Sequence, residues 1–407
     1  MEYLTSHQIA MLWNISPRLV QKLCAQGRIL GAKKHGNSWM IPSDAQKPQD
    51  PRRQKDVIPI SRQDSAFFST SASSLSSCSG LMPLMNTPFL PGHCMEKIEQ
   101  MAEGPEKEMA RAEYYYFSGQ AELALKTAGP FLDSEDLALR LSANLICGYA
   151  NLTIGEIEQA HSALHALQNL VFSIKDPSSP LFAAAVCINT AAATLLHLPL
   201  PEGLSSAQKY LALLPDGLRA FGMYVSAHSA YLHGEYERSL GIVEATLSMQ
   251  GEIYPIASIY LHLVAVMDQM SLRRPDQAQI HLLKAWDLAR PDDLIEGFGE
   301  HHGLLGGMLE AVIKKDWTDD FKRIIAITYR FSAGWRRVHN PVTGHDVADN
   351  LTTTEFAAAM LAARGWTNLE IAEQMNISPN TVKRYISTAL EKLNIRHRQD
   401  LKKYMLQ

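Results

Sequence analysis

The residues best suited to bind a polyanion lie close to the C-terminus, in the segment 378–393. On a helix, one face of this segment presents Asn380, Thr381, Lys383, Arg384 and Ser387, with Lys392 as a further candidate. Such side chains bond phosphate oxygens and base edges in the major groove of a DNA duplex. The opposite face presents Val382, Ile386, Leu390 and Leu393. This spacing is that of a buried helix face, so the segment predicts a helix held on one side and exposed to DNA on the other.

Short helices with clear start and stop signals surround this segment. Ser378 is in the N-cap position and a proline follows it in the first helical turn, where a missing N–H costs nothing. Thr367 has the cap position of the preceding helix. Thr352 and Glu355 have the spacing of a capping box, and Gly365 ends the helix that begins there. We therefore expect a bundle of four short helices over residues 346–407.

These signals resemble the DNA-binding domain of the LuxR family over about 57 residues. The resemblance is carried by LTTTE at 351–355, Gly365, TNLEIA at 367–372, ISPNTVK at 377–383 and KL at 392–393. It implies a four-helix module whose fourth helix supports dimerisation on double-stranded DNA.

The resemblance also implies roles for individual residues. Thr381 and Lys383 would lie at the major groove and Val382 near a base methyl group, while Thr367 and Ser378 would cap helices toward the DNA backbone. The sequence departs from the common pattern of the family at Thr353, Thr354, Leu369 and Tyr385. Fewer cationic contacts predict weaker or more dimer-dependent binding.

Residues 1–43 predict a second small module, again built from short capped helices with one buried side and one basic side. Thr5 or Ser6 begins a helix that buries Ile9, Ala10 and Trp13, and Ile15 fills the turn after it. Ser16 and Pro17 begin the next helix, which buries Val20, Leu23 and Cys24. The exposed side of that second helix carries Arg18, Gln21 and Lys22.

A short hairpin is expected after these helices, with strands at 32–35 and 38–41 joined by Gly36-Asn37. The whole segment resembles the winged helix-turn-helix of MerR-like and excisionase-like proteins over about 42 residues. The resemblance implies groove contacts by Arg18, Gln21 and Lys22, and phosphate contacts by the wing residues Lys33, Lys34 and His35. A structural or partner-binding role for this module is the alternative.

Residues 106–345 predict a helical region built from repeated helix pairs. An aromatic or apolar residue, a turn residue and a small residue recur in Tyr116-Gly119-Ala124, Ala150-Gly155-Ala160 and Tyr231-Gly234-Ser239. A fourth unit follows Met270 with Pro275 and Ala278, and a degenerate one surrounds Gly203 and Ala207. The pattern resembles tetratricopeptide repeats (TPRs), in which a glycine ends one helix and a small residue lets the next pack closely. An irregular helical bundle is the alternative.

Residues 44–105 predict a flexible linker, because prolines recur and serine dominates the centre. Apolar residues inside it, among them Leu81, Met82 and Leu84, either dock on a neighbouring surface or are solvated, and we favour disorder. The expected fold class is thus mainly α: a TPR-like solenoid flanked by an N-terminal winged helix-turn-helix and a C-terminal four-helix LuxR-type helix-turn-helix.

Charge is distributed unevenly along the chain. Residues 1–55 hold nine Lys and Arg against three Asp and Glu, and residues 351–407 hold eight against five. The residues between them hold 21 against 34, so nucleic acid should contact the ends of the chain. The five cysteines are widely spaced, and the sequence has no signal-peptide pattern. The apolar stretch at 181–200 favours buried helices over a membrane span. These features predict a cytoplasmic protein.

Signatures of catalysis are missing from the sequence. It contains no GxxxxGK, GxGxxG, HExxH or GxSxG motif, so we expect no enzyme, cofactor or metal. His161 and His165 favour an ordinary helix face over a metal site, and His301-His302 favours a polar turn over an active-site loop. Tyr114, Tyr115 and Tyr116 favour packing between helices, with a ligand groove as the alternative.

Two functions remain after these exclusions. The first is a transcription regulator that binds DNA as a homodimer, contacts RNA polymerase, and senses a peptide, small molecule or protein through its TPR-like region. The second is a TPR-type interaction scaffold whose terminal modules contact proteins.

Overall fold

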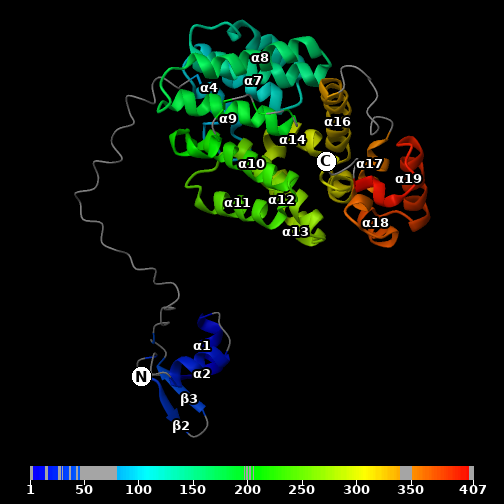
Figure 1. Ribbon diagram of the computed structural model, residues 1–407. Helices are drawn as coiled ribbons and strands as arrows, with labels where there is room; N and C mark the ends of the chain where they lie inside the picture. The colour runs from blue at the N-terminus through cyan, green and yellow to red at the C-terminus, as the bar shows by residue number, and fades with distance from the viewer. Residues whose placement is uncertain are drawn as a thin grey trace. The chain divides into compact units, whose positions relative to one another are not determined.

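The computed structural model describes residues 3–13, 17–25, 29, 31–35, 38–42, 45, 80–196, 198, 200, 203–204, 206–339 and 351–402. They divide into two compact units, Met1–Thr70 and Ser71–Gln407. Most of the described residues are helical, which confirms the prediction of a mainly α protein (Figure 1).

The N-terminal unit combines two helices with a small antiparallel sheet. Its elements are β1 (Tyr3–Thr5), α1 (Ser6–Trp13), α2 (Pro17–Ala25), β2 (Lys33–His35) and β3 (Ser38–Pro42), with strand order β1-β3-β2. Lys34 pairs with Trp39 and Leu4 with Ile41. The predicted hairpin is therefore present, whereas β1 was missed because three residues carry too little periodicity to predict a strand.

Local signals begin the first helix of this unit as expected. The Thr5 amide donates to Gln8 Oε1 at 2.9 Å and the Gln8 amide to Thr5 Oγ1 at 3.4 Å, a reciprocal capping arrangement. The core contains Ile9, Ala10, Val20, Leu23, Cys24, Ile29 and Ile41. The Trp13 side chain and residues 14–16, 36 and 37, which carried part of the prediction, lie outside the described set.

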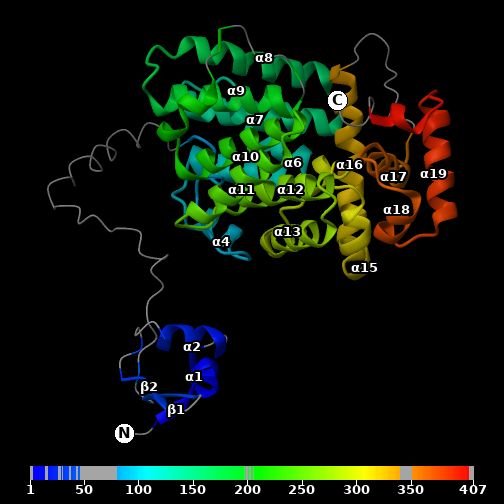
Figure 2. The same ribbon diagram turned by 60° about the horizontal axis from the view of Figure 1, so that its bottom comes forward.

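The second unit begins with a helical region in which antiparallel neighbours follow one another (Figures 1 and 2). Its helices are α4 (Cys94–Gln100), α5 (Pro105–Phe117), α6 (Ala121–Ala128), α7 (Leu137–Ile154), α8 (Ile157–Ser173), α9 (Pro180–Leu195), α10 (Asp216–Leu232), α11 (Tyr236–Met249), α12 (Pro255–Ser271), α13 (Pro275–Ala289), α14 (Glu296–His301), α15 (Lys314–Asp316) and α16 (Thr318–His339).

Four predicted repeat units coincide with helix pairs of this region. Gly119, Gly155 and Gly234 lie at the turns α5–α6, α7–α8 and α10–α11 with φ of +77°, +85° and +76°, which glycine adopts without strain. Arg273 takes the equivalent place between α12 and α13, with φ of +60°. The small residues Ala124, Ala160, Ser239 and Ala278 are all fully buried where the second helix meets its neighbours. The membership of these pairs in the TPR class stays a prediction.

The degenerate unit around Gly203 and Ala207 is not a helix pair. Two short 3₁₀ helices, Ala207–Lys209 and Leu211–Leu213, lie there instead, and Ala207 is only partly buried. Pro199, Pro201 and Pro215 surround them. Prolines remove backbone donors and disfavour helical geometry in the preceding residue, so a long helix cannot continue through this stretch.

The prediction of a flexible linker over 44–105 is wrong for residues 80–105. Leu81, Met82 and Leu84 are at most 1% exposed and belong to the main hydrophobic core. The Glu113 carboxylate accepts the amides of Leu84 and Met85 at 3.0 and 2.9 Å. Prolines and serines suggested disorder, but the buried apolar side chains compensate the lost chain entropy.

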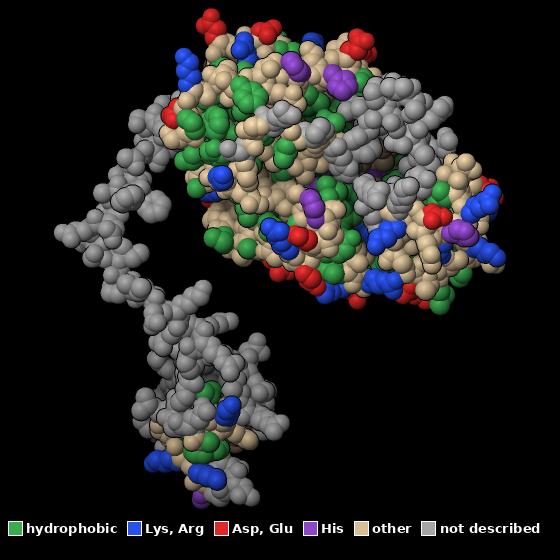
Figure 3. All heavy atoms as spheres, viewed as in Figure 1, with side chains coloured by type: hydrophobic (Ala, Val, Ile, Leu, Met, Phe, Trp, Pro, Cys, Tyr) green, Lys and Arg blue, Asp and Glu red, His purple; other side chains and the backbone are tan. Residues whose placement is uncertain are grey.

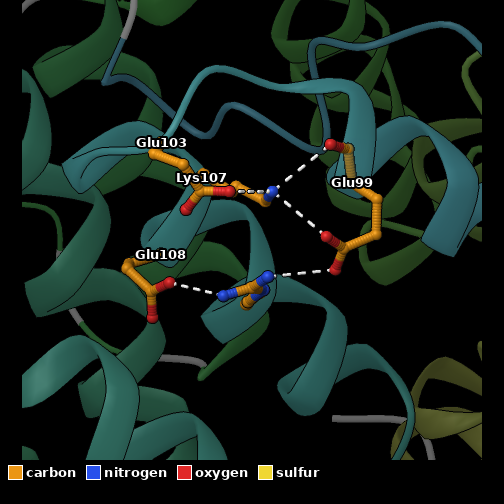
Figure 4. A network of polar contacts seen from close by, with 5 residues as sticks. Glu99, Glu103, Lys107 and Glu108 are labelled. Atoms are coloured by element: carbon orange, nitrogen blue, oxygen red, sulfur yellow. Dashed lines mark hydrogen bonds and ion pairs between the residues drawn. The ribbon is translucent and has the colours of Figure 1, made fainter.

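Hydrogen bonds to a carboxylate and ion pairs connect α4 to the rest of the unit. Asp292 accepts the amides of Gly92 and Cys94 at 2.7 and 2.9 Å. The ammonium of Lys107, on α5, lies 2.6 Å from Glu103 and 3.1 Å from Glu99, which raises the pKa of Lys107 (Figure 4). The segment before α5 is thus held by carboxylates at both of its ends.

None of the helices in the described residues is long and apolar enough to cross a membrane. The stretch at 181–200 lies mostly in α9, whose residues from Ala183 to Asn189 are buried against other helices. The described cysteines Cys24, Cys94, Cys147 and Cys187 are free and buried thiols.

Candidate nucleic-acid interface

Three capped helices form the C-terminal end of the second unit: α17 (Thr353–Ala363), α18 (Asn368–Met375) and α19 (Pro379–Lys392). Thr352 and Thr367 form capping boxes with Glu355 and Glu370. Ser378 Oγ accepts the Thr381 amide at 3.1 Å. All three caps are those expected from the sequence. A 3₁₀ turn at Arg398–Asp400 begins the last segment, of which residues 403–407 lie outside the described set.

One face of α19 is buried against α17 and α18. Val382 and Ala389 are fully buried, and Ile386 and Leu393 are nearly so. Leu390, predicted in this stripe, is only partly buried, and Ala389 takes its place because the helical turn brings it to the centre of the contact. Lys392 ties the end of α19 to α17 through an ion pair of 2.7 Å with Glu355.

Val382 is a correction to the predicted DNA-contacting set. Its side chain is 0% exposed and packs in the core between the three helices. A buried side chain cannot reach the methyl group of a base without unpacking α19. The assignment by resemblance was therefore wrong, whereas the assignment of Val382 to the buried stripe is confirmed.

The remaining predicted residues lie on the open side of these helices. Exposed side chains are those of Thr367, Ser378, Asn380, Lys383, Arg384 and Ser387, and Thr381 is half-exposed. The first turn of α19 contains no acidic residue, so its N-terminus offers backbone amides and a positive dipole end to an anion. The Arg384 guanidinium lies over the ring of Tyr385, 5.5 Å from the centroid, and remains open to solvent.

The helix-turn-helix is seated on the helical region through α17 and α18, and α19 lies at the outer side (Figures 1 and 2). Arg364, after α17, donates to Tyr231 Oη at 2.8 Å and to the Leu304 carbonyl at 2.7 Å. Arg273 donates to the Gly365 carbonyl and lies 3.8 Å from Glu370. The contact therefore orients the domain without covering the predicted DNA-binding face.

A glycine-rich segment after α14, Gly303–Gly307, lets the helix-turn-helix pack closely against the helical region. We call this contact the seat of the helix-turn-helix. A Cβ atom on Gly303 would lie 2.1 Å from Cε1 of Phe356, and one on Gly307 would lie 3.2 Å from Cγ of Met375. His301 ends α14 and His302 begins the turn after it, where a polar turn was predicted, and both side chains are buried, 4% and 2% exposed. The short side chains allow two backbones to approach, and that approach buries the segment.

A cleft borders the seat on its polar side. Its volume is about 440 Å³, and its walls are formed by α13, the segment 308–312 and α18. The walls include Arg273, Asp276, Glu370 and Glu373. Opposite charges face each other across this cleft, which is consistent with an interface between the two parts.

The predicted contacts of the N-terminal unit are exposed where the structure describes them. Gln21 and Lys22 lie on the open side of α2, and Lys33, Lys34 and His35 form the exposed strand β2. Arg18 lies in α2, but its side chain is outside the described set. Figure 3 shows blue Lys and Arg side chains on the surface of this unit and of the C-terminal helices.

Two basic residues of the C-terminal domain were missed by the sequence analysis, and one is exposed to solvent while the other bonds within the domain. Arg396, four residues after the end of α19, is exposed, and its signal was the basic run Arg396-His397-Arg398. Arg398 instead donates to the Trp366 carbonyl and to Asn368 Oδ1, which holds the last segment to α18. Spacing alone does not separate an external cation from an internal one.

Metal binding has no geometric support in the described residues, where no group of three His, Cys, Asp or Glu side chains could hold an ion. His161 is exposed on α8, and His165 lies 3.1 Å from the Asn169 amide nitrogen.

Comparison with known proteins identifies the C-terminal domain. Residues 349–405 match the family of bacterial regulatory proteins, luxR family. A similar curated protein is the probable transcriptional regulatory protein SgaR of Hyphomicrobium methylovorum, 41% identical over 54 residues. That match covers 13% of this chain and 26% of SgaR, so the chain spans about a quarter of the length of that relative. No solved structure matches the chain. The C-terminal domain is therefore a helix-turn-helix domain of the LuxR type.

Proposed function

We propose that this protein is a cytoplasmic transcription regulator that binds double-stranded DNA with the exposed face of α19. The observation that supports it best is the separation of the two faces of this helix. Val382 and Ala389 are fully buried while Lys383 and Arg384 are exposed, and neither cation forms an ion pair with the described part of the chain. A helix with one face locked and the other basic fits the major groove.

The helical region is proposed as the sensor that controls this domain. Arg364 and the Gly303–Gly307 seat couple the two parts through buried contacts. An effector that moves α14 or α12 would change the position of the helix-turn-helix, and thereby the spacing of two such domains in a homodimer on DNA. Contact with RNA polymerase and a second DNA contact by the N-terminal unit complete the proposal, which includes no enzymatic activity.

The test is a titration of duplex DNA with the full chain at several salt concentrations. Lys383→Ala/Arg384→Ala removes two cations from the open face of α19. Because each phosphate contact contributes about 0.9 to the slope of log K against log salt, the double variant should lose up to about two units of slope. It should also bind every duplex more weakly.

Matched controls separate the two ends of the chain. Lys322→Ala removes an exposed cation of α16 that pairs with Asp319 at 2.8 Å, and it should leave the slope unchanged. Lys33→Ala/Lys34→Ala reports on the N-terminal unit in the same assay. If Lys383→Ala/Arg384→Ala binds duplex with the parent affinity and slope, the proposed interface is wrong. Salt-insensitive peptide binding without duplex binding would favour the scaffold function instead.

A further inference from the structure

A small cavity inside the helical region is walled by aromatic rings and one carboxylate. Its volume is about 40 Å³, and its walls include Tyr116, Phe117, Tyr149, Phe221, Tyr260 and Glu300. These residues come from α5, α7, α10, α12 and α14, so five helices meet around it. The rings of Tyr116 and Tyr149 are 6.3 Å apart, and those of Phe221 and Tyr260 are 5.6 Å apart, in edge-to-face arrangements. Apolar side chains complete the walls: Met82, Met85, Leu145, Ile146, Ala191 and Leu195.

Glu300, the one carboxylate that lines this cavity, and its neighbour Glu296 on α14 both lack a cation. Glu300 accepts hydrogen bonds from the Tyr260 hydroxyl at 2.7 Å and from the Tyr116 hydroxyl. Glu296, one helical turn earlier, accepts from Thr153 Oγ1 at 3.3 Å, and its Oε2 has no partner. No ion pair within the described residues involves either side chain. Burial raises the pKa of both carboxyls, because a buried charge without a counter-ion is costly.

A third group at the cavity also lacks a partner. Tyr149 is 8% exposed, lines the cavity, and its hydroxyl makes no hydrogen bond. Buried hydroxyls in folded proteins are nearly always bonded to protein, water or ligand. The Tyr149 hydroxyl is therefore an acceptor available to a donor placed in the cavity.

We propose that this cavity binds the ammonium group of a small primary amine. Aromatic ring faces attract a desolvated cation, and Glu300 and Tyr149 supply oxygen acceptors for its N–H groups. The volume corresponds to about three heavy atoms, on the scale at which one water needs roughly 10–15 Å³. A quaternary ammonium group lacks N–H donors and is bulkier, and a neutral alcohol leaves the carboxylates uncompensated.

This inference rests on the proposed sensor role and gives it a chemical identity. Both carboxylates lie on α14, and the seat of the helix-turn-helix begins two residues after that helix ends, at Gly303. Ionisation of Glu300 beside a bound ammonium would reposition α14. Such a movement passes directly to Phe356, whose ring fills the space beside Gly303.

Thermal unfolding of the full chain tests amine binding without any DNA. Ethylammonium chloride should raise Tm relative to the same concentration of sodium chloride, with a dissociation constant on the order of millimolar for so few atoms. Ethanol, which has the same number of heavy atoms, and tetramethylammonium chloride should leave Tm unchanged. An equal shift with ethanol would overturn the proposal.

Three variants locate the effect. Glu300→Gln keeps one oxygen acceptor, places an NH₂ donor against the other tyrosine hydroxyl, which can accept it, and removes the charge. It should weaken ethylammonium binding at least tenfold. Tyr149→Phe removes only a hydroxyl without partners, so it should fold normally and also bind more weakly. Glu310 does not line this cavity, and its carboxylate lies 2.9 Å from Nε2 of His302. The control variant Glu310→Gln should therefore bind ethylammonium as the parent does. Parent-like binding by Tyr149→Phe and Glu300→Gln would overturn the assignment.

Duplex titration of the same samples keeps the two proposals apart. Salt-dependent duplex binding without any ethylammonium effect would overturn this inference and leave the proposed regulator intact. Ethylammonium binding without duplex binding would overturn the proposed regulator and leave the amine site intact.

Discussion

Ser378 stands at the point where α19 begins and where a DNA backbone would approach. Its hydroxyl accepts the amide of Thr381 at 3.1 Å, which satisfies one of the free donors of the first turn. Arg384 and Lys383 follow within two turns on the exposed side. At the scale of single residues, the interface thus depends on a cap that sets the first turn and on cations that the core leaves free.

Ser378→Ala should lower the stability of α19 by about 1 kcal/mol, because alanine cannot accept the Thr381 amide. Hydrogen exchange measured on the amides of α19 reports this change as a roughly fivefold faster local opening. Ser387→Ala is the matched control, since Ser387 is exposed on the same helix and caps nothing. Equal exchange rates in the two variants would contradict the role of the cap.

At the scale of elements, the glycine-rich segment after α14 determines how closely the helix-turn-helix packs against the helical region. Gly303 and Phe356 are in contact only because one of them has no side chain. Gly306 and Gly307 add φ values of +61° and +80°, a region that other residues occupy only with strain. The helix-turn-helix can therefore lie close to α14 without a cavity between them.

Gly303→Ala should weaken this seat, because the new methyl group would overlap the Phe356 ring. Overpacking of this kind costs about 1–3 kcal/mol. Limited proteolysis of the full chain should detect faster cleavage before α17, and Phe356→Leu in the same chain should partly reverse it. Gly241→Ala on α11, where an added Cβ meets nothing within 4 Å, should be neutral or slightly stabilising. A Gly303→Ala chain with parent-like cleavage would show that the seat tolerates the added methyl group.

Buried carboxyl groups couple the stability of the whole second unit to pH. Burial raises the pKa of Glu113 and of Asp268 to about 8. Buried neutral histidines act in the opposite sense at lower pH, since burial lowers the pKa of His301 to about 4 and that of His262 to about 3. Above about pH 7.5 these histidines are almost entirely neutral in both the folded and the unfolded chain, and only the acids matter.

Between about pH 7.5 and 8 the free energy of unfolding should fall as pH rises. In this window the folded chain keeps protons on Glu113 and Asp268 that the unfolded chain has lost, so each group contributes up to about 1.4 kcal/mol per pH unit. Chemical denaturation across the window measures the slope. Asp268→Asn should remove only the contribution of Asp268, and Glu113 should keep its own. Asp176→Asn should leave the slope unchanged, because hydrogen bonds from Ser178 lower the pKa of Asp176 and move its effect to acidic pH. A flat parent profile would show that these carboxyls are ionised in the fold.

Much of the local structure was readable from the sequence. Ser378, Thr367 and Thr352 begin helices as their types and spacing predicted, and Gly119, Gly155 and Gly234 lie at the predicted turns. These signals act within about four residues, where side chains and backbone meet regardless of the rest of the chain. The exposed cations of α19 followed in the same way from helical periodicity.

Only the tertiary structure decided which of these residues face solvent and which face another element. Val382 became buried, residues 80–105 joined the core, and Glu300 came to lie among aromatic rings from four other helices. Arg364 and Arg398 were drawn inward while Lys383 remained outside. Burial depends on partners far away in the chain, and no pattern of neighbouring residues contains that information.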